Sequence, residues 1–309
     1  MSNNTKFKSL SGRSFPRFSS LKSFFRLPWV SQEEDFDIGI LGIPFDGGTS
    51  YRPGARMAPT KIREMSSLAR NFNWELNKDY SKKWKVADIG DCPTTPVSLE
   101  KTYDQIEHFF NELALKEKRF ISVGGDHSIT LPILRSLAKQ HGPLNLIHFD
   151  AHLDTYPAAW GCEYHHGSFL RHALDEGLVN GSESLQIGCR NPLTSKDDLE
   201  YIQKYKIKSF TMDSIRKENF QDFLKNLPEV KGNSYITFDI DSVDPAYAPG
   251  TGTPVPAGLT SYEAIKILQN LKLEHLVGAD LVEVAPAYDN SDITSILAVS
   301  ILFEFLNLM

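Results

Sequence analysis

A run of three potential metal ligands at two-residue spacing is the strongest chemical signal in this 309-residue chain. Asp150, His152 and Asp154 directly follow the apolar segment 145–149. In extended backbone, residues at i, i+2 and i+4 project to the same side. Two carboxylates and an imidazole held this close repel one another and lose solvation unless a cation lies between them. The spacing therefore predicts a metal site, and we assign the neighbouring His148 to packing.

Two other apolar segments end in residues of the same types. His127 follows a Gly-Gly-Asp sequence that permits a tight turn, and Asp239 and Asp241 lie at the end of the segment 235–240. Together the two imidazoles and four carboxylates suit Mn²⁺ better than a structural Zn²⁺, which favours thiolates. Six protein ligands are too many for one catalytic ion, but they suffice for two ions that share carboxylates. Two such ions about 3.5 to 4 Å apart can make water nucleophilic at neutral pH.

Short apolar segments alternate with helical patterns from Phe36 onward, and these elements must position the ligands. The predicted strands are 38–41, 84–87, 120–123, 145–149, 184–187, 209–212, 235–240 and 276–281, and the predicted helices are 58–68, 99–115, 129–139, 213–224, 261–271 and 291–306. Strands that are apolar throughout are typical of a parallel sheet covered on both faces. We therefore predict one α/β domain with the ligands at the carboxyl ends of its strands. Thr260 or Ser261, followed by Glu263, predicts one helix start.

Composition and charge argue against several classes of protein. With 41% hydrophobic residues, the chain can bury a large core, which argues against a disordered or disulfide-scaffold protein. The net charge of -6 argues against nucleic-acid binding, and no apolar run approaches the ~20 residues that span a membrane. The three cysteines are far apart and odd in number, which indicates reduced thiols in a cytoplasmic compartment.

The first 32 residues have a composition of their own. They contain six Lys and Arg residues, eight serines and no acidic residue. We predict that residues 1–32 form an N-terminal arm lying on the body or on a neighbouring subunit, and that residues 33–309 form a single catalytic domain. An organellar transit peptide is the alternative, although Gly12 and Pro16 would interrupt an amphipathic helix there.

Three stretches together resemble the signatures of the ureohydrolases, the family of arginase, agmatinase and their relatives. They are GGDHS, FDAHLDTY and SYITFDIDSVDPAYAPGTGTPVPAGLT, and the resemblance extends from roughly Arg26 to the C-terminus. It implies an arginase-like, three-layer α/β/α fold around an eight-stranded parallel sheet. It also implies two Mn²⁺ ions per chain and hydrolysis of a guanidino group to urea.

The resemblance further implies roles for individual residues. One manganese ion would be held by His127, Asp150, Asp154 and Asp239, and the other by Asp150, His152, Asp239 and Asp241. Asp150 and Asp239 would then bridge the pair, and Asp154 would relay a proton from the attacking water. Glu283 would bind the planar guanidinium. His166, which precedes a glycine as in the family's mobile loop, would protonate the leaving amine, with His165 as the alternative.

The loop after Asp154 resembles agmatinases more than arginases. Residues 155–167 lack the Ser-Gly-Asn stretch that holds an α-amino acid, and they run through Gly-Cys-Glu to His-Gly. We predict agmatine as the substrate, giving putrescine and urea in polyamine biosynthesis, with Glu163 as a candidate ligand for the distal amine. The stretch 157–160 is longer than in agmatinases and His165 replaces an Asp, so guanidinobutyrate, guanidinopropionate and guanidine remain alternatives. A carboxylate-bearing substrate would call for an arginine, either Arg171 or Arg190.

Two readings from other functional classes remain open. One is a non-catalytic regulatory homologue that binds ligand without turnover, and the other is a single-zinc deacylase. The complete set of predicted ligands argues against both. The resemblance also implies a homo-oligomer, either a trimer or a hexamer, whose partner is a small guanidino substrate. The cytoplasmic location is predicted from the cysteines.

Overall fold

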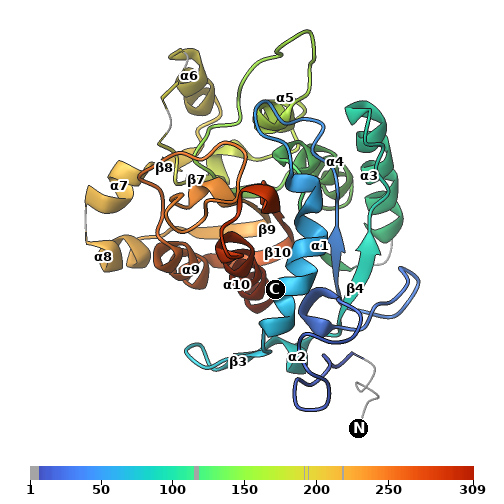
Figure 1. Cartoon of the computed structure of the whole chain (residues 1–309). Coiled ribbons are helices and arrows are strands. Elements are labelled where there is room, and N and C mark those ends of the chain that lie inside the picture. The colour runs from blue at the N-terminus through green and yellow to red at the C-terminus, as the bar shows by residue number, and fades with distance from the viewer. Residues whose placement is uncertain (1–6, 115–117, 191, 194, 218) are drawn as a thin grey trace.

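The computed structural model describes residues 7–114, 118–190, 192–193, 195–217 and 219–309. Within them, eight parallel strands form one sheet in the order β4-β1-β5-β10-β9-β6-β7-β8 (Figure 1). The strands are β1 Ile38–Gly42, β4 Val86–Asp91, β5 Arg119–Val123, β6 Asn145–Phe149, β7 Leu185–Ile187, β8 Lys208–Phe210, β9 Glu229–Asp239 and β10 Lys272–Val282. A separate antiparallel pair joins β2 Phe72–Asn73 to β3 Lys78–Asp79. The predicted eight-stranded parallel sheet is confirmed.

Each of the eight predicted strands is present, although several ends differ from the prediction. β9 and β10 begin at Glu229 and Lys272, several residues before the predicted starts. Their first halves are partly exposed and carry polar residues, whereas their second halves are continuously buried. The apolar signal therefore marks only the buried half of each strand.

Helices connect the strands and end the chain. They are α1 Ala58–Met65, α2 Tyr80–Lys83, α3 Leu99–Ala114, α4 Thr130–His141, α5 Phe169–Asp175, α6 Asp197–Lys204, α7 Met212–Lys217, α8 Phe220–Lys225, α9 Ser261–Asn270 and α10 Ile293–Leu308. The single helix predicted for 213–224 is wrong, because the side chain of Asn219 accepts a hydrogen bond from Gln221 N and starts α8 as a new helix. Thr260 and Glu263 form the expected capping box at α9. None of the described helices has the length and apolarity needed to cross a bilayer.

The sheet separates two apolar cores. On one face, Ile62 of α1 and Leu302 of α10 pack with Ile40 of β1. On the other face, Phe110 of α3 and Leu134 of α4 belong to a second core. Because helices cover both faces (Figure 1), the predicted three-layer α/β/α arrangement is confirmed.

Part of the predicted N-terminal arm lies against the sheet. Phe24, Phe25 and Leu27 are buried in the apolar core. The Phe24 N–H donates to Asp88 Oδ2 at 2.9 Å, and the same carboxylate pairs with the buried Arg63. These contacts attach residues 24–27 to the body, while the boundary at residue 32 stays a prediction.

Candidate metal centre

Four neighbouring strands deliver the predicted site residues to one edge of the sheet. β5, β10, β9 and β6 lie side by side in that order and are parallel, so their carboxyl ends meet. His127 follows β5 and Glu283 follows β10, whereas β9 ends at Asp239 and Asp150 follows β6. The sequence segments are far apart along the chain, and the sheet order brings them together.

A first cluster surrounds the Nδ1 atom of His127. Its three neighbours are Asp154 Oδ2 at 3.0 Å, Asp150 Oδ2 at 3.1 Å and Asp239 Oδ2 at 3.3 Å. All four side chains are buried, with at most 5% of any residue exposed. One imidazole nitrogen and three carboxylate oxygens thus face a common point.

A second cluster surrounds the Nδ1 atom of His152. Asp241 Oδ2 lies 3.1 Å from it and Asp150 Oδ1 lies 3.2 Å from it. Asp150 therefore presents one oxygen to each cluster, as a bridging carboxylate would. Asp239 presents Oδ2 to the first cluster, while its Oδ1 accepts a hydrogen bond from Asp241 N at 2.7 Å.

The electrostatics of the clusters favour bound cations. His127 Nδ1 is buried and has no hydrogen-bond partner among the described residues, although three carboxylate oxygens surround it. Burial, together with the Asp241 and Asp150 carboxylates, holds the pKa of Asp239 well above its ordinary value. Burial also raises the pKa of Asp241. A divalent cation would stabilise the ionised forms of Asp239 and Asp241 and so lower both pKa values. This set of oxygen and imidazole donors fits two such ions.

The backbone at the site is unusual at three positions. Gly125 allows the chain to turn into His127, because a Cβ atom there would lie 2.1 Å from Phe45 O. Asp154 and Glu283 have φ values of 52° and 62°, in the left-handed region that residues with side chains rarely adopt. Such strain persists only where surrounding contacts enforce it, and it is common at functional sites.

Half-buried His166 and buried Glu283 form a pair beside the clusters. His166 Nδ1 lies 2.8 Å from Glu283 Oε1, and His166 Nε2 lies 2.6 Å from Ser50 Oγ. Burial alone would lower the pKa of His166, but the Glu283 carboxylate and the nearby Asp126 and Asp154 raise it to about 9. Glu283 Oε1 also accepts the N–H of His127 at 2.9 Å, so Oε2 is the oxygen left for a ligand.

The adjacent His165 has a different environment. Its Nε2 atom lies 3.0 Å from the carbonyl oxygen of Pro157, so this contact joins two parts of the loop 155–167, and burial lowers the pKa of His165. Glu163, the candidate ligand for a distal amine, does not belong to the cavity wall. Its residue is exposed, and its backbone carbonyl accepts a hydrogen bond from His172. The structure therefore does not bring the Glu163 side chain to the cavity.

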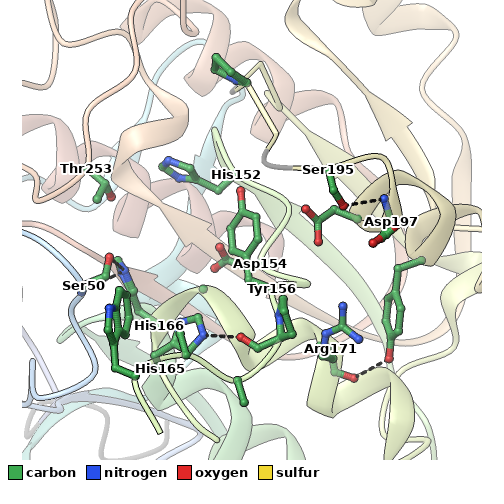
Figure 2. A pocket seen from close by; sticks show the side chains of 18 of the residues that line it. Ser50, His152, Asp154, Tyr156, His165, His166, Arg171, Ser195, Asp197 and Thr253 are labelled. Carbon is green, nitrogen blue, oxygen red and sulfur yellow. Dashed lines mark hydrogen bonds between the residues drawn. The ribbon is translucent and has the colours of Figure 1, made fainter. Parts of the chain in front are cut away.

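A cavity of about 770 Å³ opens above the clusters. His152, Asp154 and Asp239 lie in its wall together with His166. Figure 2 shows Ser50 and His166 on one side of this cavity and Arg171 and Asp197 on the other. The sequence analysis missed the acidic residues of α6, because no strand or ligand spacing marks them.

The assignment of His148 to packing alone is incomplete. His148 is in phase with Asp150, and its Nε2 atom lies 2.8 Å from Asp150 Oδ2. Gln186 Nε2 donates to Leu153 O at 3.1 Å and lies 3.2 Å from His148 Nδ1. Since this amide nitrogen is a donor, His148 Nδ1 accepts a hydrogen bond from it. The imidazole proton is then on Nε2, which donates a hydrogen bond to Asp150 Oδ2. His148 thus orients the carboxylate that both clusters share.

Comparison with known proteins supports the resemblance found in the sequence. The model of the arginase family matches residues 36–307. Guanidinopropionase of Pseudomonas aeruginosa is 37% identical over 97% of this chain and 95% of its own, and agmatinase of Cronobacter sakazakii is 39% identical over 93% of each. Proclavaminate amidinohydrolase of Streptomyces clavuligerus is 39% identical over 94% of each chain. Its structure aligns with a TM-score of 0.89, covering 94% of this chain and 97% of that one. The chain therefore belongs to the arginase family.

Proposed function

We propose that this protein is a binuclear-manganese hydrolase that cleaves a guanidino compound to urea and an amine. The observation that carries the proposal is the division of Asp150, whose two oxygens face His127 Nδ1 and His152 Nδ1 separately. The enzymes among its relatives, which include an agmatinase and a guanidinopropionase, support the same class of reaction. A non-catalytic homologue would have no need to keep both clusters and the His166–Glu283 pair.

In the proposed reaction, the metal ligands are the six residues of the two clusters. They are His127, Asp150, Asp154, Asp239, His152 and Asp241. Bound cations would supply an activated water and a Lewis acid. Asp154 lines the cavity and would accept a proton from the attacking water. His166 would donate a proton to the departing amine, while Glu283 Oε2 would orient the guanidinium.

Agmatine is the substrate we propose. Its guanidinium would face the clusters, and its distal ammonium would reach the opposite wall of the cavity. Asp197 and Asp198 at the start of α6 line that wall and carry the charge that an ammonium requires. These two residues replace Glu163 as the proposed ligands for the amine.

A carboxylate-bearing guanidino compound is the second candidate, and Arg171 favours it. Arg171 lines the same wall, with its Nε donating to Thr155 O at 2.7 Å and its guanidinium 4.2 Å from the Tyr201 ring centroid. Within the described residues, no hydrogen bond is made by its two terminal nitrogens. Arg190 is not a comparable candidate, because its guanidinium donates to backbone carbonyls such as Asp241 O and Val255 O.

A urea-release assay of the manganese-loaded protein separates these substrates. The panel is agmatine, arginine, guanidinobutyrate, guanidinopropionate and guanidine. We expect the highest kcat/KM with agmatine, and a KM for agmatine raised about 10-fold in Asp198→Asn, as loss of one charged contact would give. Arg171→Gln is the matched control and should leave that KM unchanged. Preference for guanidino acids, with the larger loss in Arg171→Gln, would select the second candidate, and no urea from any compound would reject the proposed reaction.

Three other features of the proposed enzyme also stay predictions. They are its assembly into a trimer or hexamer, its cytoplasmic location and its place in polyamine biosynthesis. Size-exclusion chromatography with light scattering tests the first of these directly.

A further inference from the structure

A row of polar residues crosses the sheet beneath the two clusters. Asp280 of β10 pairs in register with Thr237 of β9, which pairs in turn with His148 of β6. Each of these side chains is at most 1% exposed. Buried polar groups in the middle of a parallel sheet cost stability unless hydrogen bonds satisfy them, so their partners indicate what they do.

Asp280 is a carboxylate with three hydroxyl partners. Thr237 Oγ1 lies 2.6 Å from its Oδ1, while Tyr235 Oη and Thr130 Oγ1 lie 2.8 and 2.9 Å from its Oδ2. Hydroxyl groups that converge on both oxygens are the donors that an ionised carboxylate requires. Asp280 itself touches neither the cavity nor the clusters, so its effect on the site must pass through one of these partners.

Thr237 is that partner, because its hydroxyl also contacts His127. His127 Nε2 lies 2.8 Å from Thr237 Oγ1. Threonine has a single hydroxyl proton, and the contact of 2.6 Å to Asp280 Oδ1 directs it there. Thr237 Oγ1 must then accept from His127, which requires the proton of the imidazole to be on Nε2. His127 Nδ1 is thereby left with a lone pair that faces the first cluster.

We propose that Asp280, acting through Thr237, is a positioning residue that fixes His127 with its Nδ1 lone pair directed at the metal ion of the first cluster. The inference rests on the metal centre proposed above. Without the carboxylate, the Thr237 hydroxyl is free to donate to His127 Nε2. The imidazole then carries its proton on Nδ1, and this nitrogen no longer has a lone pair for a cation. Partners of this kind behind a metal-binding histidine orient the ring and raise its basicity.

The test is manganese binding by Asp280→Leu, an apolar replacement of similar size that leaves the Thr237 hydroxyl without this acceptor. The apoprotein is prepared by chelation and titrated with MnCl₂, with free Mn²⁺ followed by electron paramagnetic resonance. We expect one of the two binding steps to weaken about 10- to 100-fold, as for other partners of metal-binding histidines, and the other step to change much less. Anomalous scattering from crystals at limiting Mn²⁺ identifies the retained ion, which should be the one at His152.

Two further sets of variants separate positioning from a structural role. Tyr235→Phe removes one donor from Asp280 Oδ2 but leaves the contact with Thr237, so it should bind both ions as the wild type does. Thr237→Ser keeps the hydroxyl and should also bind normally, whereas Thr237→Val should match Asp280→Leu. Each apoprotein should still unfold in one cooperative thermal transition, which shows that the fold is retained even where the lost hydrogen bonds lower the melting temperature.

Several results would overturn the inference while leaving the proposed function intact. These are unchanged binding by Asp280→Leu, equal weakening of both steps, and equal weakening by Thr237→Ser and Thr237→Val. A wild-type protein that binds no manganese would instead contradict the proposed metal centre itself.

Discussion

Replacing His166 with alanine should slow turnover without releasing metal. Neither nitrogen of His166 belongs to the two clusters, because Nδ1 faces Glu283 and Nε2 faces Ser50. Glu283 Oε1 keeps its hydrogen bond from His127 N when the imidazole is removed. The substitution therefore removes the proposed proton donor and leaves the proposed metal ligands in place.

The expected loss follows from the role of a general acid. Such groups contribute about 10²- to 10⁴-fold to a rate, or about 2.7 to 5.4 kcal/mol of the activation barrier. We expect kcat for urea release to fall by that factor, with two manganese ions per chain retained by elemental analysis. His165→Ala is the matched control, because it removes the neighbouring imidazole and its contact with Pro157 O. It should raise KM through a looser loop and change kcat little.

The pH profile gives a second measurement on the same variant. A general acid acts only when protonated, so activity should be present below its pKa and fall as pH rises through it. The pKa of His166 is raised to about 9 by Glu283 and neighbouring carboxylates against the effect of burial. Bound cations should bring this value down, which places the falling limb below pH 9. A kcat of His166→Ala within about 3-fold of wild type, or an unchanged falling limb, would refute the role.

Three other perturbations test the metal centre, the fold and the burial of one acid. Asp150→Asn should lose both ions and all urea release, since both clusters share this carboxylate, and metal analysis that finds one ion retained would contradict the shared role. Gly125→Ala should lower stability by more than about 3 kcal/mol in urea denaturation, because the new Cβ would lie 2.1 Å from Phe45 O; a loss no larger than that of Gly12→Ala, where the nearest atoms belong to the Arg17 side chain, would show that the turn can relax. Burial raises the pKa of Glu304, so the cost of ionising it in the folded state is absent at low pH and appears as pH rises through that pKa. Glu304→Gln should therefore raise the melting temperature at pH 7 but not near pH 4, and an equal gain at both values would refute the effect of ionisation.

Much of the site could be predicted from local sequence because its residues follow apolar strands directly. Asp150 and Asp239 are marked by the strands before them, and the carboxyl ends of parallel strands lie along the same edge of the sheet. The positions of the proposed metal ligands were therefore predicted from their two-residue spacing and from the apolar strands that precede them. Neither of these signals requires knowledge of which strands are neighbours.

Other parts of the molecule could not be predicted in this way. Asp280 and Thr237 are single polar residues within apolar strands, and their pairing depends on the order of β9 and β10 in the sheet. No local sequence pattern indicates that order. The short helices α5 and α6 were missed because their 7 and 8 residues span about two turns, which gives too little periodicity to detect. Glu163 was chosen for its charge, and only the course of the loop shows that it faces solvent.

The sheet order also constrains when a newly made chain can acquire its metal. β5 and β6 are synthesised early, but in the finished sheet β10 and β9 are inserted between them. Until residue 282 has left the ribosome and both late strands have entered this gap, His127 and Asp150 have no fixed separation. Completion of the proposed two-ion centre is therefore among the last steps of maturation.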